Sequence, residues 1–173
     1  MMDGVAKWLK NECIKWKKND VNSRSFEEYL YGYFDFNNSF VNQSTESVYG
    51  IWIKITTQEG YDNLIKDLNK SSKKITSSKV DAIFSDESGT WYPLYWGKDI
   101  NPGSRIRAHF RTGNGTGGLD LSRQKFLHNY EMKWGNILVR DYDSFENYLH
   151  KTSPPILGTS CRGGISKCIN ILY

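Results

Sequence analysis

The stretch WYPLYWGKDINPGSRIRAHFR, residues 91–111, predicts a strand, a short loop and a helix in direct succession. Aromatic and aliphatic residues fill its first third, which favours a strand over residues 91–97. Pro93 disfavours a central, fully paired position for the first half of that strand, because proline has no backbone N–H to donate. Asn101 as N-cap and Pro102 at the first helical position predict a helix that runs to about Arg111.

The two faces of this predicted helix differ in chemistry. Residues four apart lie on one face of a helix, so Arg105 and His109 point the same way. Ile106 and Phe110 form the face that is buried. The stretch therefore places a guanidinium and an imidazole beside a strand that carries Tyr95.

The elements around this stretch extend the pattern. Residues 80–85 predict a strand, and turn residues 86–89 join it to residues 91–97 as an antiparallel hairpin. Residues 112–119 are rich in glycine and predict a flexible or ligand-facing loop. Residues 137–142 predict a third strand, and Asp143 caps a helix that ends before two prolines.

The N-terminal half predicts further helices and one strand. Residues 5–18 have apolar side chains at helical spacing, and residues 25–34 start with the spacing of a capping box. Residues 48–55 are β-branched and aromatic, which predicts a strand, and Thr57 opens a helix that runs to Leu68.

These elements predict an α+β fold with a small three-stranded antiparallel sheet flanked by helices. The predicted core domain covers residues 79–160. Residues 1–78 form an N-terminal helical and strand extension, and residues 161–173 form a C-terminal tail.

Composition limits the class of protein. The chain has 173 residues, a net charge of +4, six Trp and eleven Tyr, which favours a folded protein that tolerates a polyanionic partner. Cys13, Cys161 and Cys168 are odd in number and lack paired spacing, so neither a disulfide framework nor a zinc site is expected. Without an apolar span or a secretory signal, we expect a cytoplasmic protein with no membrane partner.

Two segments resemble the GIY-YIG nuclease family. In the first, Tyr95-Trp96-Gly97-Lys98 is similar to the family's Tyr-aliphatic-Gly-Lys strand, and Arg105 stands ten positions after Tyr95, at the family spacing. His109 falls where several restriction-type members carry His or Tyr. In the second, residues 145–149 (FENYL), followed by Pro155 and Gly158, resemble the family's metal-site helix, with Glu146 as its glutamate. The resemblance covers roughly residues 79–160.

The resemblance implies a metal-dependent endonuclease that hydrolyses phosphodiester bonds, with DNA as the first choice of substrate and RNA as the second. Arg105 would fork onto the phosphate, and Glu146 would hold Mg²⁺ or Mn²⁺ through oxygen. Tyr95 would orient the attacking water or, deprotonated near the metal, accept its proton, and His109 would assist as a base or phosphate donor. Contacts to the nucleic-acid backbone are expected from Lys98, Arg107 and Arg111.

The family's first motif, Gly-Ile-Tyr, has no clear counterpart. The strand before Tyr95 offers residues 79–81, with Asp81 in the tyrosine position, or residues 82–84, with Phe84 there. An Asp could act as a base, whereas a Phe could not. Residues 50–52 (Gly-Ile-Trp) match by letters but need a long insertion inside the hairpin, so they rank lower. Gly158 replaces the family's terminal Asn.

Three alternatives stay open. Glu146 lies three residues after Asp143, so it could simply complete a helix cap. The chain could be a catalytically silent nucleic-acid-binding module on the same fold. It could also be an unrelated α/β interaction protein, in which case Tyr95, Arg105 and Glu146 would not lie together.

Overall fold

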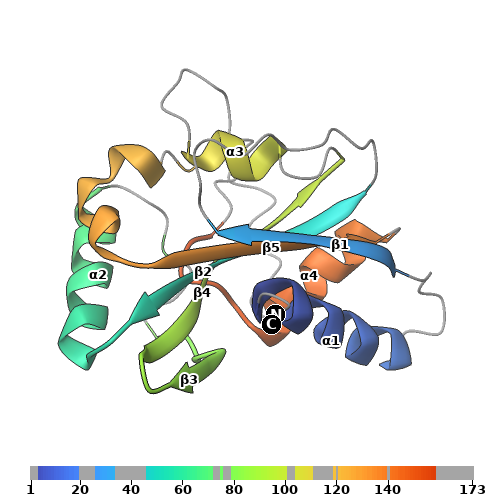
Figure 1. Ribbon diagram of the computed structural model, residues 1–173, viewed down its shortest axis with the longest axis horizontal. Helices are drawn as coiled ribbons and strands as arrows, with labels where there is room; N and C mark the ends of the chain where they lie inside the picture. Colours follow the sequence, from blue (N-terminus) through green and yellow to red (C-terminus); the bar gives the residue numbers. More distant parts are fainter. Residues whose placement is uncertain are drawn as a thin grey trace, which may run out of the picture.

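A five-stranded antiparallel sheet in the order β1-β5-β2-β4-β3 organises the chain (Figure 1). The computed structural model describes residues 4–19, 26–33, 46–71, 75, 79–100, 104–110, 119, 121–139 and 141–158. The strands are β1 (Phe26–Tyr33), β2 (Ser47–Ile55), β3 (Phe84–Asp86), β4 (Gly89–Asp99) and β5 (Met132–Val139). The helices are α1 (Gly4–Asn19), α2 (Gln58–Lys70), α3 (Ser104–Phe110) and α4 (Tyr142–Thr152), with 3₁₀ turns at Leu121–Arg123 and Lys125–Asn129.

Helices cover both faces of the sheet, and each face has its own apolar core. One core joins α1 and α4 to the sheet through side chains that include Leu9, Trp52 and Phe145. The other core joins α2 and α3 to the opposite face through side chains that include Ile53 and Ile106. Figure 1 shows α1 and α4 on one side of the sheet and α3 on the other. β2 lies between β5 and β4, and these two cores bury its two faces.

The sheet has five strands, so the expectation of three strands is wrong, although the α+β class and the flanking helices are confirmed. β2 pairs with β4 on one side and with β5 on the other. The division predicted at residue 78/79 therefore does not correspond to a break in the sheet. Residues 56–88, which include α2 and β3, connect β2 to β4 along the chain.

The helix predicted over residues 25–34 is wrong, because residues 26–33 form strand β1. β1 pairs antiparallel with β5 from Phe26↔Val139 to Tyr33↔Lys133, with a register shift near its start. The segment is rich in aromatic residues, which pack well on a pleated sheet. Pairing with a distant strand therefore outweighs the local spacing of a capping box.

The remaining elements follow the local signals closely. α1 lies where the apolar spacing predicts it, and α2 follows Thr57 as predicted, with the Thr57 hydroxyl accepting a hydrogen bond from the Gly60 N–H at 3.0 Å. β3 and β4 form the predicted hairpin, but β3 is only three residues long. β5 begins five residues earlier than expected, and Asp141 rather than Asp143 is the N-cap residue of α4.

Pro93 lies at an irregular place in β4, as its missing N–H requires. The register with β2 shifts beside it, from Ile51↔Tyr95 to Trp52↔Pro93, and β3 ends before reaching it. The carbonyls of Pro93 and Leu94 instead accept hydrogen bonds from the N–H groups of Ile156 and Leu157, each at 2.9 Å. These bonds fix the segment after α4 against β4.

Among the described residues, every helix is too short or too polar to cross a bilayer.

Candidate functional site

Three rings from three elements meet on the α3 side of the sheet. They are Tyr49 from β2, Tyr95 from β4 and His109 from α3. The ring centroids lie 6.1 Å apart for the two tyrosines, 5.7 Å for Tyr49 and His109, and 5.0 Å for Tyr95 and His109. All three side chains are buried, with Tyr95 retaining 8% of its surface against 2% for Tyr49 and 1% for His109. Tyr95 is thus the most accessible of the three.

Gly97 makes this cluster geometrically feasible. It pairs with Tyr49 across β2 and β4, and the Tyr49 phenol lies over its backbone. A Cβ atom on residue 97 would lie 2.8 Å from Cε1 of Tyr95 and still closer to Cζ and Oη of Tyr49. The Tyr-x-Gly pattern therefore has a packing reason, because only glycine leaves room for the phenol of the neighbouring strand.

Hydrogen bonds run through the cluster in one direction. The Leu119 N–H donates to Nδ1 of His109 at 3.0 Å, so Nδ1 carries no proton and the neutral ring carries its proton on Nε2. Nε2 lies 2.6 Å from the Tyr49 hydroxyl oxygen, which accepts this proton. The Tyr49 O–H is then available to donate to Tyr95; burial raises the pKa of Tyr95, and this bond offsets part of the rise. The direction of donation points from the interior towards Tyr95.

Burial raises the pKa of both tyrosines. Burial raises the pKa of Tyr49 well above its usual value, and the neighbouring Tyr95 adds to the effect. Burial also raises the pKa of Tyr95, and the Glu146 carboxylate raises it further. The Arg105 guanidinium lowers the pKa of both tyrosines. Both phenols are therefore protonated at neutral pH and act as hydrogen-bonding groups.

Asp99 fixes the start of α3 and with it Arg105. The buried carboxylate of Asp99 accepts hydrogen bonds from the Ser104 hydroxyl at 3.1 and 2.9 Å and from the Arg105 N–H at 2.8 Å. The Asp99 carbonyl accepts a hydrogen bond from the hydroxyl of Ser47 at 3.1 Å, which ties α3 to β2. Arg105 is exposed, while Ile106 on the next position is buried, as the helix periodicity predicts.

Glu146 comes from α4, which packs on the opposite face of the sheet from the cluster, and it keeps 8% of its surface exposed. Its carboxylate still interacts electrostatically with Tyr95. Its Oε2 is 3.4 Å from the ammonium of Lys98, which also pairs with Asp143. Its Oε1 is 4.0 Å from Nε2 of His150. Burial raises the pKa of Glu146, whereas Lys98 and Arg105 lower it. The pKa of His150 is lowered by burial and by Lys98, so its ring is neutral at physiological pH.

The structure brings most of the predicted site residues together. Tyr95, Arg105 and Glu146 interact electrostatically, and His109 contacts Tyr95. Arg107 is exposed on α3, whereas Arg111 and the loop at 112–119, apart from Leu119, lie outside the described residues. Lys98 lies between two carboxylates instead of standing free for a phosphate.

The candidates for the first tyrosine position lie elsewhere. Asp81 is exposed before β3. Phe84 packs against Trp52 and Trp91, whose core covers the opposite face of the sheet from Tyr49. The residue that sequence reasoning missed is Tyr49, one position before the Gly-Ile-Trp letters at 50–52. The available signal was Gly97, because a glycine within a strand leaves room for a large side chain on the neighbouring strand.

Metal binding at this site would rest on few protein ligands. Within the described ranges, no three or more His, Cys, Asp or Glu side chains gather as a ligand set. Glu146 supplies a hard oxygen donor in a partly desolvated position, which suits Mg²⁺ or Mn²⁺ bound largely by water and phosphate. His128 takes no part, because its Nε2 is 2.9 Å from the Ser122 carbonyl oxygen.

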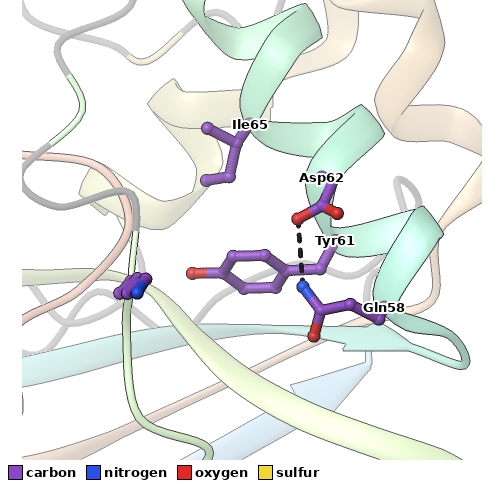
Figure 2. Close-up of a pocket in the computed structure, with 5 residues that line it drawn as sticks. Gln58, Tyr61, Asp62 and Ile65 are labelled. Carbon is purple, nitrogen blue, oxygen red and sulfur yellow. Dashed lines mark hydrogen bonds between the residues drawn. The ribbon is translucent and has the colours of Figure 1, made fainter.

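A separate cavity lies against α2 and shares no residue with this cluster (Figure 2). It encloses about 290 Å³ and is lined by Gln58, Tyr61, Asp62, Ile65 and Lys79. Gln58 donates to Asp62 at 3.0 Å, and the Tyr61 hydroxyl accepts a bond from the Val80 N–H at 3.1 Å. The lining is thus held within the connection between β2 and β4.

Comparison with protein-family models, with curated proteins and with solved structures found no match, so no relative assigns a function to this chain.

Proposed function

We propose that this chain is a metal-dependent endonuclease of the GIY-YIG type that hydrolyses phosphodiester bonds in DNA. The observation that carries the proposal is the meeting of Tyr49, Tyr95 and His109 beside Arg105 and Glu146. Five side chains that the chemistry needs come from β2, β4, α3 and α4. These residues are far apart in the sequence, and their approach supports the proposal.

Tyr49 supplies the tyrosine that the resemblance leaves open. Ser47-Val48-Tyr49 on β2 would take the place of Gly-Ile-Tyr, and Tyr95-Trp96-Gly97 on β4 the place of its partner. Tyr49 pairs with Gly97 in register, so the two motifs lie side by side in adjacent strands. The connection over residues 56–88 is then an insertion between the two motif strands.

The substrate phosphate is proposed to lie between Arg105 and Glu146. The exposed guanidinium of Arg105 would donate two hydrogen bonds to phosphate oxygens and stabilise the negative charge that grows on them. A divalent cation held by Glu146 would supply further charge neutralisation at the same phosphate. Exposed Arg107 would contact the backbone farther along and add a salt-dependent contribution to binding.

The tyrosines are proposed to position the attacking water. Tyr95 keeps some exposed surface, so its hydroxyl is the one that would contact the water. Tyr49 and His109 lie behind it and hold its hydroxyl through the directed hydrogen bonds. His109 has both ring nitrogens engaged, so we assign it a positioning role and not a contact with the phosphate.

The proposal is tested by incubating supercoiled plasmid with the full chain and Mg²⁺ or Mn²⁺. We expect nicking by the wild type and a loss of about 100-fold or more in Glu146→Ala and in Arg105→Ala, as for other electrostatic stabilisers. Lys66→Ala, an exposed cation on α2, is the control and should cleave normally. Absence of cleavage by the wild type with every metal, with DNA binding retained, would identify a silent binding module instead.

A further inference from the structure

His150 lies one helical turn after Glu146 on α4, on the same face of the helix. The two oxygens of the Glu146 carboxylate face different groups. Oε2 faces the Lys98 ammonium at 3.4 Å, and Oε1 faces Nε2 of His150 at 4.0 Å. The Lys98 side thus leaves Oε1 as the oxygen available to another partner.

Nε2 of His150 is buried and has no hydrogen-bond partner among the described residues. At 4.0 Å from Glu146, it is too far for a hydrogen bond to that carboxylate. Buried polar atoms are normally satisfied, so an unsatisfied one beside a carboxylate calls for an explanation. The imidazole side chain as a whole keeps 25% of its surface exposed, so the site lies near solvent.

We propose that Glu146 and His150 together bind a divalent cation, through Oε1 and Nε2 respectively. This inference rests on the proposed function, because it adds a second protein ligand to the cation expected at Glu146. Bonds from such an ion to carboxylate oxygen and imidazole nitrogen are each about 2.0–2.2 Å long. Neighbouring ligands of an octahedral ion are about 3 Å apart, so these two donor atoms, now 4.0 Å apart, would approach each other by about 1 Å to bind one ion.

An imidazole ligand changes which metal the site prefers. Mg²⁺ favours oxygen ligands, whereas Mn²⁺, Co²⁺ and Zn²⁺ accept imidazole nitrogen readily. A site with Glu146 alone would discriminate weakly between Mg²⁺ and Mn²⁺. The Glu146–His150 pair binds Mn²⁺ more tightly than Mg²⁺, and His150 is the residue that sets this preference.

The test measures Mn²⁺ binding to the full chain without nucleic acid, so it does not depend on cleavage. Electron paramagnetic resonance titration gives the affinity, and electron spin echo modulation detects ¹⁴N of a coordinated imidazole. We expect the wild type to show the nitrogen modulation and His150→Ala to lose it, with Mn²⁺ affinity falling by about tenfold or more. Mg²⁺ affinity, measured by competition, should fall by less.

His128→Ala is the matched control, because its imidazole is engaged with Ser122 and should not affect the signal. His150→Gln provides a second variant if alanine impairs folding, which circular dichroism would report. Mn²⁺ affinity and nitrogen modulation unchanged by loss of His150, or no Mn²⁺ binding by the wild type, would overturn the inference. A His150-dependent modulation in a chain that cleaves nothing would support the metal site and contradict the nuclease proposal. Cleavage without the nitrogen modulation would support the nuclease proposal and contradict the Glu146–His150 metal site.

Discussion

Replacing Gly97 with alanine should displace the Tyr49 phenol and disable the site. The added Cβ would lie 2.8 Å from Cε1 of Tyr95, whereas carbon atoms in contact are about 3.5–4.0 Å apart. Tyr95 would have to move by about 0.7 Å, and Tyr49, which lies closer, by more. Overpacking of this kind costs about 1–3 kcal/mol. In a chain of this size that lowers the melting temperature by about 2–12 °C.

The loss of cleavage should exceed what this loss of stability explains. A displacement of about 1 Å in catalytic geometry lowers the rate by about 100-fold, so Gly97→Ala should cleave plasmid about 100-fold more slowly at a temperature where it is fully folded. Melting followed by circular dichroism and single-turnover cleavage measure the two effects separately.

Gly135→Ala is the matched control for this prediction. A Cβ at residue 135 would lie 2.7 Å from the backbone nitrogen of Ala6, so it strains the contact between β5 and α1. It should destabilise the chain to a similar extent while leaving Tyr49, Tyr95 and His109 in place. The account of the site is refuted if Gly97→Ala retains its cleavage rate or loses no more than Gly135→Ala.

Three further predictions follow from the hydrogen bonds and charges. Burial raises the folded-state pKa of Tyr49 above its usual 10.0, so above pH 10 the unfolded chain ionises first and the free energy of unfolding falls with pH. Tyr49→Phe should reduce the slope of the free energy of unfolding against pH by up to about 1.4 kcal/mol per pH unit, measured by urea titrations. An unchanged slope would count against the burial of Tyr49. Lys98→Met removes a charge that lowers the pKa of Glu146, so the acidic limb of the pH profile of cleavage should move to higher pH. An unmoved limb would show that Lys98 does not influence the ionisation of Glu146 that cleavage requires. Nitrogen NMR should find neutral His109 protonated on Nε2; a proton on Nδ1 would contradict the bond from Leu119.

Much of the fold could be predicted because its signals are local. The spacing of apolar residues in α1 and the Thr57 cap of α2 act within a few residues of chain. On α3, helix periodicity correctly placed Ile106 and Phe110 in the core and Arg105 at the surface, but His109, expected on the face of Arg105, is buried with 1% of its surface exposed. β4 and α3 follow one another in the predicted order, while Asn101 and Pro102, the predicted start of the helix, lie outside the described residues.

The pairing of distant strands could not be predicted in this way. β1 carries the letters of a helix cap, but it pairs with β5, which lies about a hundred residues later in the chain. Tyr49 was missed for the same reason, because residues 56–88 separate it from Tyr95 and only the sheet brings the two together. The approach of His150 to Glu146 could not be predicted either, since it depends on how α4 packs beside Lys98.

The most direct test of the central claim is single-turnover cleavage of a DNA duplex by the wild type and by Glu146→Gln in Mg²⁺. Glutamine keeps the shape of the side chain and removes the charge that would hold the cation, so folding and DNA binding should be retained. We predict cleavage by the wild type and a loss of about 100-fold or more in the variant. Equal cleavage by the two proteins, or none by a wild type that binds DNA, would contradict the assignment of a hydrolytic site at Tyr95, Arg105 and Glu146.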